Sequence, residues 1–386
     1  MEKQRKKVLV LTSTFPRWKD DTLPPFVYEL SKRLAEYFDI TVLAPSYPGA
    51  KDFEIMDGMK VYRFHYFLRP FEKLAGSGGI LPVLKTKPLY YLVVPFFLLG
   101  EYLAARKIVK EIKPDIIHAH WIIPQGLIAY FIKKKYNVPY VVTSHGSDLM
   151  GIKNFNSIKN IILKNAKNIT VVSNFLKEEV KKINLNLKAD VIPMGVDSEL
   201  FNPNKKDLNI KKKYKIEGIF LLYVGRLAPE KGVEKIIELM PSILSKYNNI
   251  KLILIGEGVL KDKLLKKVKE LKIVNNVIFI KWINNRELPK YYATADYFIC
   301  LSEREGMPIS YIEALACGTP IIVNNLPVCH ELVGKNRGYI LKNNVKEQIL
   351  LYLLKNKKIN KMRLHNYIKR NYDWKNITNK YLRILK

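Results

Sequence analysis

Segments with the pattern of a buried strand alternate with segments of helical pattern along almost the whole chain of 386 residues. Short apolar runs such as Val8–Thr12 predict buried strands, whereas Phe26–Phe38 carries Phe26, Leu30, Leu34 and Phe38 at the spacing of one helical stripe. Because strands that alternate with helices form parallel βαβ units, the chain is predicted to be an α/β protein.

The predicted strands fall into two groups of similar architecture. The first group is Val8–Thr12, Ile40–Ala44, Asp115–His118, Tyr140–Thr143, Asn168–Val172 and Asp190–Ile192. The second group is Phe220–Val224, Lys251–Ile255, Val277–Ile280, Tyr297–Leu301 and Pro320–Val323. Between the groups lie a turn-rich passage, residues 193–204, and the lysine-rich stretch 205–215, which predict a domain junction. Two Rossmann-like, doubly wound domains are therefore expected, and the length of the chain suits two.

Composition narrows the setting in which the protein works. Three cysteines, an odd number without a Cys-Xaa-Xaa-Cys motif, indicate a reducing, cytoplasmic compartment. The net charge of +31 suits an anionic partner such as a membrane surface, a nucleic acid or a phosphorylated substrate, although a lysine-rich composition alone would also produce it. The longest apolar run, Leu89–Leu99, is too short to span a bilayer and predicts a buried helix or an interfacial segment.

Two glutamates eight residues apart, Glu305 and Glu313, are the most informative candidates for function. Glu305 follows the predicted strand Tyr297–Leu301, and Glu313 lies within a predicted helix, residues 308–316, that Gly318 would end. Ligands of open α/β sheets bind beside the carboxyl ends of strands. Two carboxylates there could accept hydrogen bonds from the hydroxyls of a sugar nucleotide, although an isolated glutamate pair is more often solvated.

Basic residues and glycines follow the strands that neighbour this segment in the sequence. Arg226 and Lys231 come after the strand Phe220–Val224 and just before a helix predicted from Val233, a layout that suits phosphate binding. Gly256 follows the strand Lys251–Ile255, where a glycine permits close backbone approach. Basic side chains in such loops are common, so spacing alone leaves a purely structural role open.

Histidines follow strands of the first group. His118 and His120 would share one face of a strand, but a lone pair is weak evidence for metal, and no third ligand or other metal site is evident. His145 follows the strand Tyr140–Thr143 in the motif His-Gly-Ser-Asp. Taken alone, such a histidine is more often a structural hydrogen bonder.

The stretch from Glu305 to Pro320 closely resembles the signature of retaining glycosyltransferases of family four, which have the GT-B fold. The Gly-Arg at Arg226, the Glu-Lys-Gly at Lys231, His-Gly-Ser-Asp at His145 and the His-Ala-His-Trp at His120 are also similar to that family. The resemblance implies two Rossmann-like domains facing a cleft, an acceptor domain over residues 1–195 and a donor domain over residues 196–371. The last helix, within residues 372–386, would return to the first domain.

The resemblance also implies roles for individual residues. Catalytic roles fall to Glu305, His145, Arg226 and Lys231, with Arg226 and Lys231 holding the donor diphosphate in place of a metal ion. Donor-binding residues would be Arg226, Lys231, Gly256, Glu305, Gly306, Met307, Pro308 and Glu313, with Glu313 at the ribose. His120 and Trp121 would lie on the acceptor side. Arg17 could join them, because the 15–25 loop lacks the glycine pair of many relatives.

The function expected from this resemblance is retaining transfer of a sugar from a nucleoside-diphosphate sugar to a hydroxyl acceptor, a glycan or a lipid-linked molecule, without a cofactor. An epimerase of the same fold and a basic protein that binds membranes or nucleic acid are the alternatives. Nucleic acid is not expected, because aromatic and basic RNA-binding motifs are absent from the sequence. Residues 65–99 interleave apolar and basic side chains, which predicts peripheral contact with an anionic membrane, at its inner face. The sugar, the base and the oligomeric state are not readable from the sequence.

Overall fold

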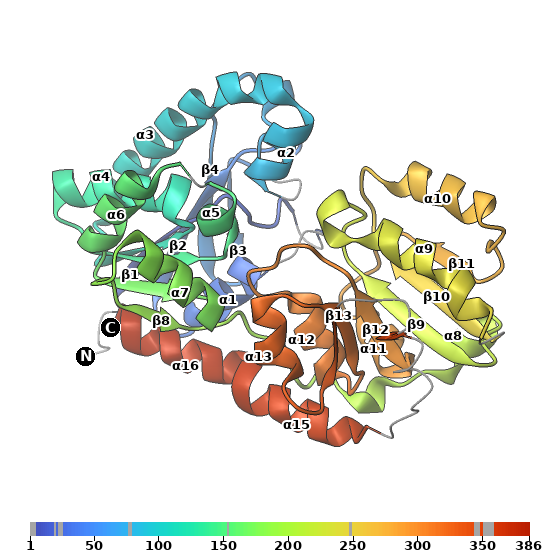
Figure 1. Cartoon of the computed structure of the whole chain (residues 1–386). Coiled ribbons are helices and arrows are strands. Elements are labelled where there is room, and N and C mark those ends of the chain that lie inside the picture. The colour runs from blue at the N-terminus through green and yellow to red at the C-terminus, as the bar shows by residue number, and fades with distance from the viewer. Residues whose placement is uncertain are drawn as a thin grey trace. The chain divides into compact units, whose positions relative to one another are not determined.

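The computed structural model describes residues 5–18, 21, 26–75, 79–152, 154–246, 249–342, 348–349 and 359–386. The chain forms two compact units, one of Met1–Met194 with Ile377–Lys386 and one of Gly195–Asn376 (Figure 1). Most of the 15–25 loop and residues 76–78 of the predicted interfacial segment lie outside the described residues.

The first unit is built on an eight-stranded sheet in the order β3-β4-β2-β1-β5-β6-β7-β8. All neighbours pair in parallel except β3 and β4, which form an antiparallel hairpin at one edge. The strands are β1 (Lys7–Leu11), β2 (Asp39–Pro45), β3 (Phe53–Met56), β4 (Met59–Phe64), β5 (Ile116–His120), β6 (Tyr140–Ser144), β7 (Asn168–Val171) and β8 (Ala189–Val191). The six predicted strands are confirmed, and the hairpin is an addition to them.

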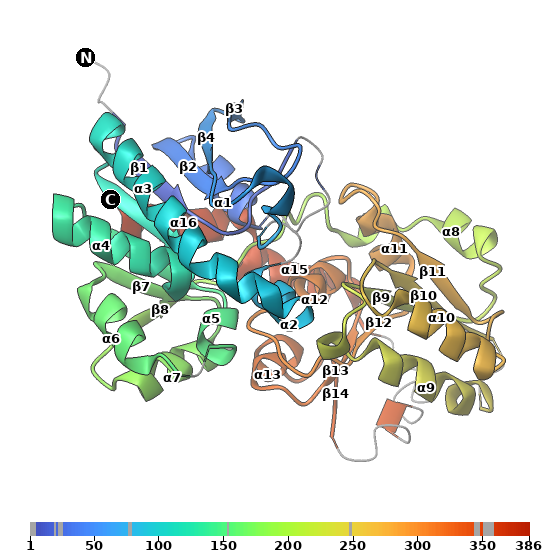
Figure 2. The same ribbon diagram turned by 90° about the horizontal axis from the view of Figure 1, so that it is seen from above.

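Helices cover both faces of this sheet, as Figure 2 shows for α3 and α4 on one side and α1 and α16 on the other. They are α1 (Phe26–Leu34), α2 (Ile80–Thr86), α3 (Val94–Ile112), α4 (Leu127–Tyr136), α5 (Ser147–Met150), α6 (Asn156–Asn165) and α7 (Asn174–Ile183). Short helical turns are η1 (Arg69–Phe71), η2 (Pro88–Val93) and η3 (Ile122–Gly126). Leu30 and Leu34 of the predicted stripe are buried on α1, and Phe38 is buried just beyond it.

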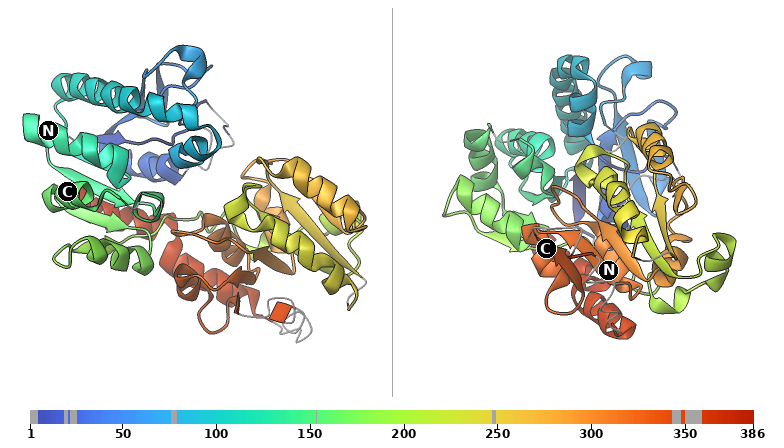
Figure 3. Two further views of the ribbon diagram at one scale, coloured as in Figure 1. Left: turned by 45° about the horizontal axis from the view of Figure 1, so that its top comes forward. Right: turned by 45° about the vertical axis from the view of Figure 1, so that its right-hand side comes forward.

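The second unit has a six-stranded parallel sheet in the order β11-β10-β9-β12-β13-β14 (Figure 3). Its strands are β9 (Ile219–Val224), β10 (Ile250–Ile255), β11 (Val277–Ile280), β12 (Tyr297–Cys300), β13 (Ile321–Asn324) and β14 (Gly338–Leu341). Its helices are α8 (Leu208–Lys213), α9 (Val233–Leu244), α10 (Lys261–Glu270), α11 (Leu288–Thr294), α12 (Ile309–Ala316), α13 (Pro327–Val333) and α15 (Lys361–Tyr372), with the turns η4 (Pro203–Lys205) and η5 (Pro229–Lys231). The five predicted strands are confirmed.

The last helix, α16 (Trp374–Leu385), returns to the first unit as expected. Its residues Ile377, Tyr381 and Leu385 recur at helical spacing and are fully buried. The Tyr381 ring lies 5.3 Å from the His118 ring of β5, and its hydroxyl lies 3.3 Å from the Thr143 hydroxyl of β6. The end of the chain therefore forms part of the core of the first unit.

The segment that follows β4 differs in part from the sequence prediction. Leu74 and Leu84, which the prediction placed among interfacial residues, are buried in the first unit. The run Leu89–Leu99, predicted to be buried or interfacial, is only partly buried: Val93 and Phe97 are buried, whereas Leu89, Leu92 and Leu99 are largely exposed. No described helix is both long enough and apolar enough to cross a bilayer.

Candidate active site

The second sheet has its topological switch point between β9 and β12. The chain passes from β9 to β10 and β11 on one side, and later enters β12 on the other side of β9. Because both strands are parallel, the loops that follow them leave the sheet at the same edge. The sequence places Arg226 and Lys231 in one of these loops and Glu305 in the other. The fold thus brings together candidates that are about 80 residues apart in the chain.

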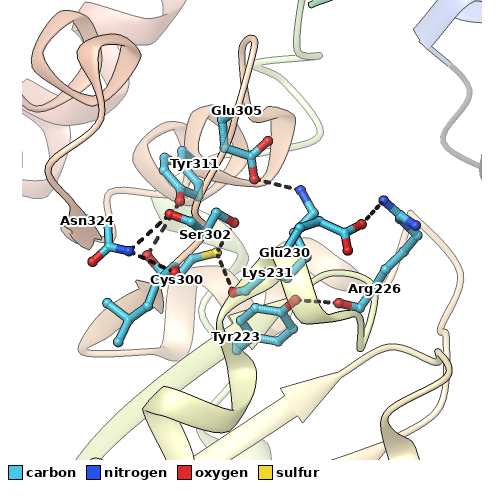
Figure 4. A network of polar contacts seen from close by, with 10 residues as sticks. Tyr223, Arg226, Glu230, Lys231, Cys300, Ser302, Glu305, Tyr311 and Asn324 are labelled. Carbon is cyan, nitrogen blue, oxygen red and sulfur yellow. Dashed lines mark hydrogen bonds and ion pairs between the residues drawn. The ribbon is translucent and has the colours of Figure 1, made fainter. Parts of the chain in front are cut away.

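Lys231 and Glu305 form an ion pair at this switch point (Figure 4). The Lys231 Nζ lies 2.6 Å from Glu305 Oε1, and the two side chains are only 21% and 10% exposed. Burial disfavours the ammonium, but the charge of Glu305 and the hydrogen bond to it outweigh that effect, so the pKa of Lys231 is raised. The lysine is therefore a permanent, partly desolvated cation.

Arg226 makes a second ion pair in the same loop. Its guanidinium donates to Glu230 Oε1 at 2.8 Å, and about a third of each side chain is exposed. The Tyr223 hydroxyl donates to the Arg226 carbonyl oxygen at 2.7 Å, which fixes the backbone at the end of β9. Figure 4 shows the Arg226 and Lys231 side chains rising from the same short loop. Two cations thus lie within one loop, each held by a carboxylate that an anionic ligand could replace.

Glycine permits the two loops to meet. Gly232 has a φ of +65°, and a Cβ there would collide with the Leu301 carbonyl oxygen. On the β12 side, Asn324 donates to the carbonyl oxygens of Leu301 and Ser302 at 2.9 and 3.1 Å. The Glu303 amide donates across the gap to the Glu230 carbonyl oxygen at 2.9 Å. The backbone that carries the Lys231–Glu305 ion pair is therefore fixed by contacts between the loops that follow β9 and β12.

The β10 end supplies Gly256 to the same edge. Its φ is +148°, and any side chain would collide with the Gly225 carbonyl oxygen, so only glycine fits here. The Trp282 ring lies 3.6 Å from the place that a Cβ would occupy. Backbone at the ends of β9 and β10 is thus packed closely beside one aromatic ring.

The residues after Glu305 lead directly into α12. Gly306 and Pro308 are buried, Met307 is partly buried against the core of the unit, and Pro308 caps the helix. Gly318, with a φ of +74°, follows the end of α12, as the sequence predicted. These residues position the loop, in which Glu305 pairs with Lys231 and the more exposed Glu303 pairs with Lys235.

Glu313 lies farther along α12 and has a different partner. The Tyr292 hydroxyl of α11 donates to Glu313 Oε2 at 2.9 Å. Burial raises the pKa of Glu313 to about 7, although some of the side chain is exposed. This carboxyl is therefore close to half ionised at neutral pH.

In the first unit, three imidazoles gather at the carboxyl ends of β5 and β6. His120 Nδ1 lies 3.0 Å from His145 Nε2, and the rings of His118 and His120 are 4.2 Å apart, which confirms that these two share a strand face. His118 Nε2 lies 2.8 Å from the Thr143 hydroxyl. His145, already a catalytic candidate from the sequence, is thus the third member of this cluster. Its contact with His120 was not predicted, because it depends on the pairing of β5 with β6. The described residues contain no group of three that could hold a metal ion.

Burial keeps all three imidazoles neutral. It lowers the pKa of His118 and of His145 to about 3, and the pKa of His120 well below its usual range. Between His120 and His145, one ring nitrogen must then donate and the other accept. The cluster can offer hydrogen bonds to hydroxyl groups, but it supplies no charge near neutral pH.

Asp148 fixes the loop that carries His145. Its carboxylate accepts hydrogen bonds from the Ser144 hydroxyl at 2.7 Å, the Gly146 amide at 3.1 Å and the Ile122 amide at 2.7 Å. Trp121 has a φ of +78°, a strained value for an aromatic residue, and its ring centroid lies 4.8 Å from that of His145. His120 and Trp121, which were predicted to lie on the acceptor side, therefore both contact His145.

Arg17 is committed to an ion pair within its own loop. Its guanidinium makes two hydrogen bonds to Asp21, at 2.7 and 2.8 Å, and stacks on the rings of Trp18 and Tyr47. The side chain is therefore held against Tyr47, just after β2, and an anion would have to compete with Asp21 for it.

The sequence did not reveal which residues contact the predicted site residues. Glu230, Tyr292 and Asp148 each hold a predicted residue or its loop. Glu230 and Asp148 stand inside the quoted motifs, so a signal for them was present. Tyr292 had none, because it meets Glu313 only through the packing of α11 on α12.

Comparison with known proteins gives the same class that the fold and the strand-end residues indicate. Residues 25–200 match the family model described as Glycosyltransferase Family 4, and residues 204–374 match that of Glycosyl transferases group 1. A glycosyltransferase of Methanocaldococcus jannaschii, the uncharacterized MJ1178, is 30% identical over 278 residues, which are 69% of this chain and 72% of that protein. The putative teichuronic acid biosynthesis glycosyltransferase TuaC of Bacillus subtilis is 28% identical over 75% of this chain and 69% of its own length.

Solved structures share the fold at low sequence identity. Sucrose-phosphate synthase of Thermosynechococcus elongatus has a TM-score of 0.79 at 16% identity and covers 98% of both chains. HepE of Anabaena, solved in complex with UDP-glucose, has a TM-score of 0.73 at 14% identity over 98% of this chain and 99% of its own. The molecule is an enzyme of the GT-B glycosyltransferase class. The chain belongs to the family of glycosyl transferases group 1, with an N-terminal domain of glycosyltransferase family 4.

Proposed function

We propose that this glycosyltransferase moves a sugar from a nucleoside-diphosphate sugar to a hydroxyl acceptor with retention of the anomeric configuration. The observation that carries the donor assignment is the part-buried ion pair of Lys231 and Glu305 at the switch point of the second sheet. Ligands of open α/β sheets bind at such points. The complex of HepE with UDP-glucose supports a nucleotide sugar as donor, and the low identity leaves the sugar and the base open.

Arg226 and Lys231 would bind the donor diphosphate. Each is now paired with a carboxylate, Glu230 and Glu305 respectively, so the cations are already in place before an anion arrives. In the reaction the bond between the anomeric carbon and the phosphate oxygen breaks, and negative charge grows on the leaving diphosphate. Fixed cations next to that charge stabilise the transition state more than the bound donor. This supply of positive charge is the basis for proposing a metal-independent reaction.

The remaining roles follow from the chemistry of each side chain. Glu305, released from Lys231 by the diphosphate, would accept hydrogen bonds from hydroxyls of the transferred sugar. Glu313 would accept them from the ribose, with Tyr292 holding the carboxylate in place. His145, neutral and positioned by His120 and Asp148, would hydrogen-bond a sugar hydroxyl, and Trp121 would offer an apolar face to the acceptor. The acceptor would be a glycan or a lipid-linked molecule.

Product analysis tests the reaction and its stereochemistry together. The protein would be incubated with UDP-, GDP- or ADP-sugars in excess EDTA, with and without a pool of hydroxyl acceptors, and the products examined by NMR. An α-linked product from an α-linked donor, formed only with acceptor present, supports the proposal. An altered free sugar nucleotide without acceptor would show an epimerase instead. Activity that EDTA abolishes and magnesium or manganese restores would contradict the roles given to Arg226 and Lys231.

A further inference from the structure

Nine large apolar side chains of the first unit are exposed along two segments that meet. One segment follows β4, and the other comprises η2 and the first half of α3. We call this set the apolar surface: Phe67, Leu68, Phe71, Leu89, Tyr91, Leu92, Phe96, Leu99 and Leu103. Leu89 is 80% exposed and Leu92 is 72% exposed, values that are unusual for leucines grouped in one place.

Ring contacts join the two segments into one continuous surface. The Phe67 ring centroid lies 6.5 Å from that of Phe71 in its own segment and 5.8 Å from that of Phe96 on α3. A shallow hollow of about 300 Å³ lies where the segments meet, lined by Phe67, Phe96, Leu99 and Leu103 with the backbone of Gly100 beneath. Figure 2 shows α2 lying beside the start of α3, close to this junction.

The underside of the apolar surface is firmly packed. Val93 and Phe97 are buried, and the Phe97 ring contacts the Tyr66 ring with centroids 4.9 Å apart. The buried carboxylate of Glu72 accepts hydrogen bonds from the backbone amides of Tyr66 and Phe67 at 2.7 and 3.3 Å. The outward direction of the apolar residues is therefore a property of the folded unit.

Exposed lysines outnumber exposed carboxylates around the apolar surface. Residues 52–111 contain nine lysines and arginines and six acidic residues. Arg63 and Arg69 are paired with Glu54 and Asp52, and Glu72 and Glu101 are buried. Lys73, Lys85 and Lys87 are exposed in the same segments as the apolar residues. On α3 the outward stripe of Phe96, Leu99 and Leu103 continues one and two turns later as the exposed lysines Lys107 and Lys110. The basic rim thus extends along the helix that carries the apolar residues.

We propose that the apolar surface docks onto the face of an anionic lipid bilayer. Apolar side chains bordered by lysines are what an interfacial segment requires, since the former enter the acyl boundary and the latter meet anionic headgroups. A protein partner would need apolar contacts too, but the excess of exposed lysines at the border complements an anionic lipid leaflet in particular. The link to glycosyl transfer rests on the proposed function, because docking would bring the first unit to a lipid-linked acceptor. The affinity for lipid does not depend on it.

Vesicle co-sedimentation of the full chain without any sugar nucleotide tests the surface alone. Wild type is expected to bind vesicles of phosphatidylcholine with 30 mol% phosphatidylglycerol far better than pure phosphatidylcholine, and to be released by high salt. The triple variant Leu89→Ser, Leu92→Ser, Phe96→Ser should bind roughly 100-fold more weakly, because three inserted side chains lose their apolar contacts. The double variant Lys85→Ser, Lys87→Ser should bind roughly tenfold more weakly with a smaller salt effect.

A matched control comes from the other edge of the same sheet. Ile161 on α6 and Leu185 after α7 are also exposed, and the double variant Ile161→Ser, Leu185→Ser should bind vesicles like wild type. Circular dichroism and thermal melting confirm that each variant is folded. Turnover on a water-soluble acceptor, measured separately, should be equal in wild type and the triple variant; loss of turnover in both would reject the proposed function without touching the docking.

Three results would overturn the docking proposal. Wild type could fail to bind either kind of vesicle, or the triple variant could bind as well as wild type. Wild type could also self-associate without lipid, with the triple variant remaining monomeric in sedimentation velocity, which would show that a second copy covers the surface.

Discussion

The two units carry different kinds of side chain at the carboxyl ends of their parallel strands. In the second unit the ends of β9 and β12 carry paired charges, Lys231 with Glu305 and Arg226 with Glu230. In the first unit the ends of β5 and β6 carry neutral imidazoles, which burial keeps unprotonated. Under the proposed function this difference divides the work between the units, because fixed charges suit a diphosphate, whereas neutral hydrogen-bonding rings suit hydroxyls.

The largest expected effect comes from removing the buried cation of the second unit. Lys231→Met keeps the length of the side chain but removes its charge, so turnover should fall by roughly 10²–10³-fold, the scale of losing a group that stabilises developing charge. Lys235→Met is the matched control, because Lys235 pairs with Glu303 at a similar distance of 2.9 Å but in an exposed position. Steady-state kinetics of both variants test this prediction. Equal turnover would show that the charge of Lys231 does not contribute to the reaction.

Glu305→Gln should reduce turnover by roughly 100-fold, since the amide keeps the shape but loses the charge that meets Lys231 and the sugar hydroxyls. Glu303→Gln, two residues earlier and exposed, should have little effect. The KM for the donor and the kcat are measured separately, with thermal melting as a check of folding. Near-normal transfer by Glu305→Gln would show that the carboxylate belongs to the fold and not to the reaction.

A smaller effect is expected in the first unit. His145→Ala removes one neutral hydrogen bond to substrate, so kcat/KM should fall by roughly tenfold, the scale of a single such bond. His330→Ala, at an exposed position of the second unit, is the control. A loss as large as that of Lys231→Met would contradict the division between the units, because it would give His145 a role beyond hydrogen bonding.

The pH dependence of stability should also run in opposite directions in the two units. The three histidines have lowered pKa values in the folded unit. Below about pH 6.5 the unfolded chain therefore binds protons that the folded unit does not bind. His118 and His145 then each destabilise the folded state by on the order of 1 kcal/mol at pH 5.5. Thermal melting at pH 5.5 and 7.5 should show a smaller acid loss in His145→Asn than in wild type.

Glu313 has the reverse sign, because its pKa rises to about 7 on folding. The folded unit holds this proton more tightly than the unfolded chain, so its stabilising contribution is complete below about pH 4.5 and is lost as the pH rises through 7. Between pH 5.5 and 7.5 the loss is about 2 kcal/mol, and Glu313→Gln should remove it. Melting of this variant against Glu287→Gln, an exposed control, tests the sign; the same pH dependence in all three proteins would refute it.

Strands of the core were predictable because parallel strands covered on both faces are continuous apolar runs. The β3–β4 hairpin was not predicted, because β3 is a short edge strand with Phe53 and Ile55 exposed. The sequence Asp57-Gly58 is nevertheless a typical hairpin turn. The exposure of Leu89 and Leu92 was equally hidden, since an apolar run looks the same in sequence whether it is covered or not.

Site residues were predictable as residue types at strand ends, but their pairing was not. Nothing near Lys231 in the sequence indicates Glu305 as its partner, because that contact depends on β12 entering the sheet beside β9. The contact of His120 with His145 depends in the same way on β5 beside β6. The pKa of Glu313 depends on the packing of α11 on α12, which no local pattern reveals.

The central claim is that the charged strand ends of the second unit hold the donor. Calorimetric titration of UDP-glucose into wild type, Lys231→Met and Lys235→Met, all in excess EDTA, tests it most directly, with GDP- and ADP-glucose used in the same way if UDP-glucose does not bind. Wild type and Lys235→Met should bind the sugar nucleotide, and Lys231→Met should bind it at least roughly tenfold more weakly, on the scale of a lost charge-assisted contact. Equal affinity of all three proteins, or no binding of any sugar nucleotide by wild type, would contradict it.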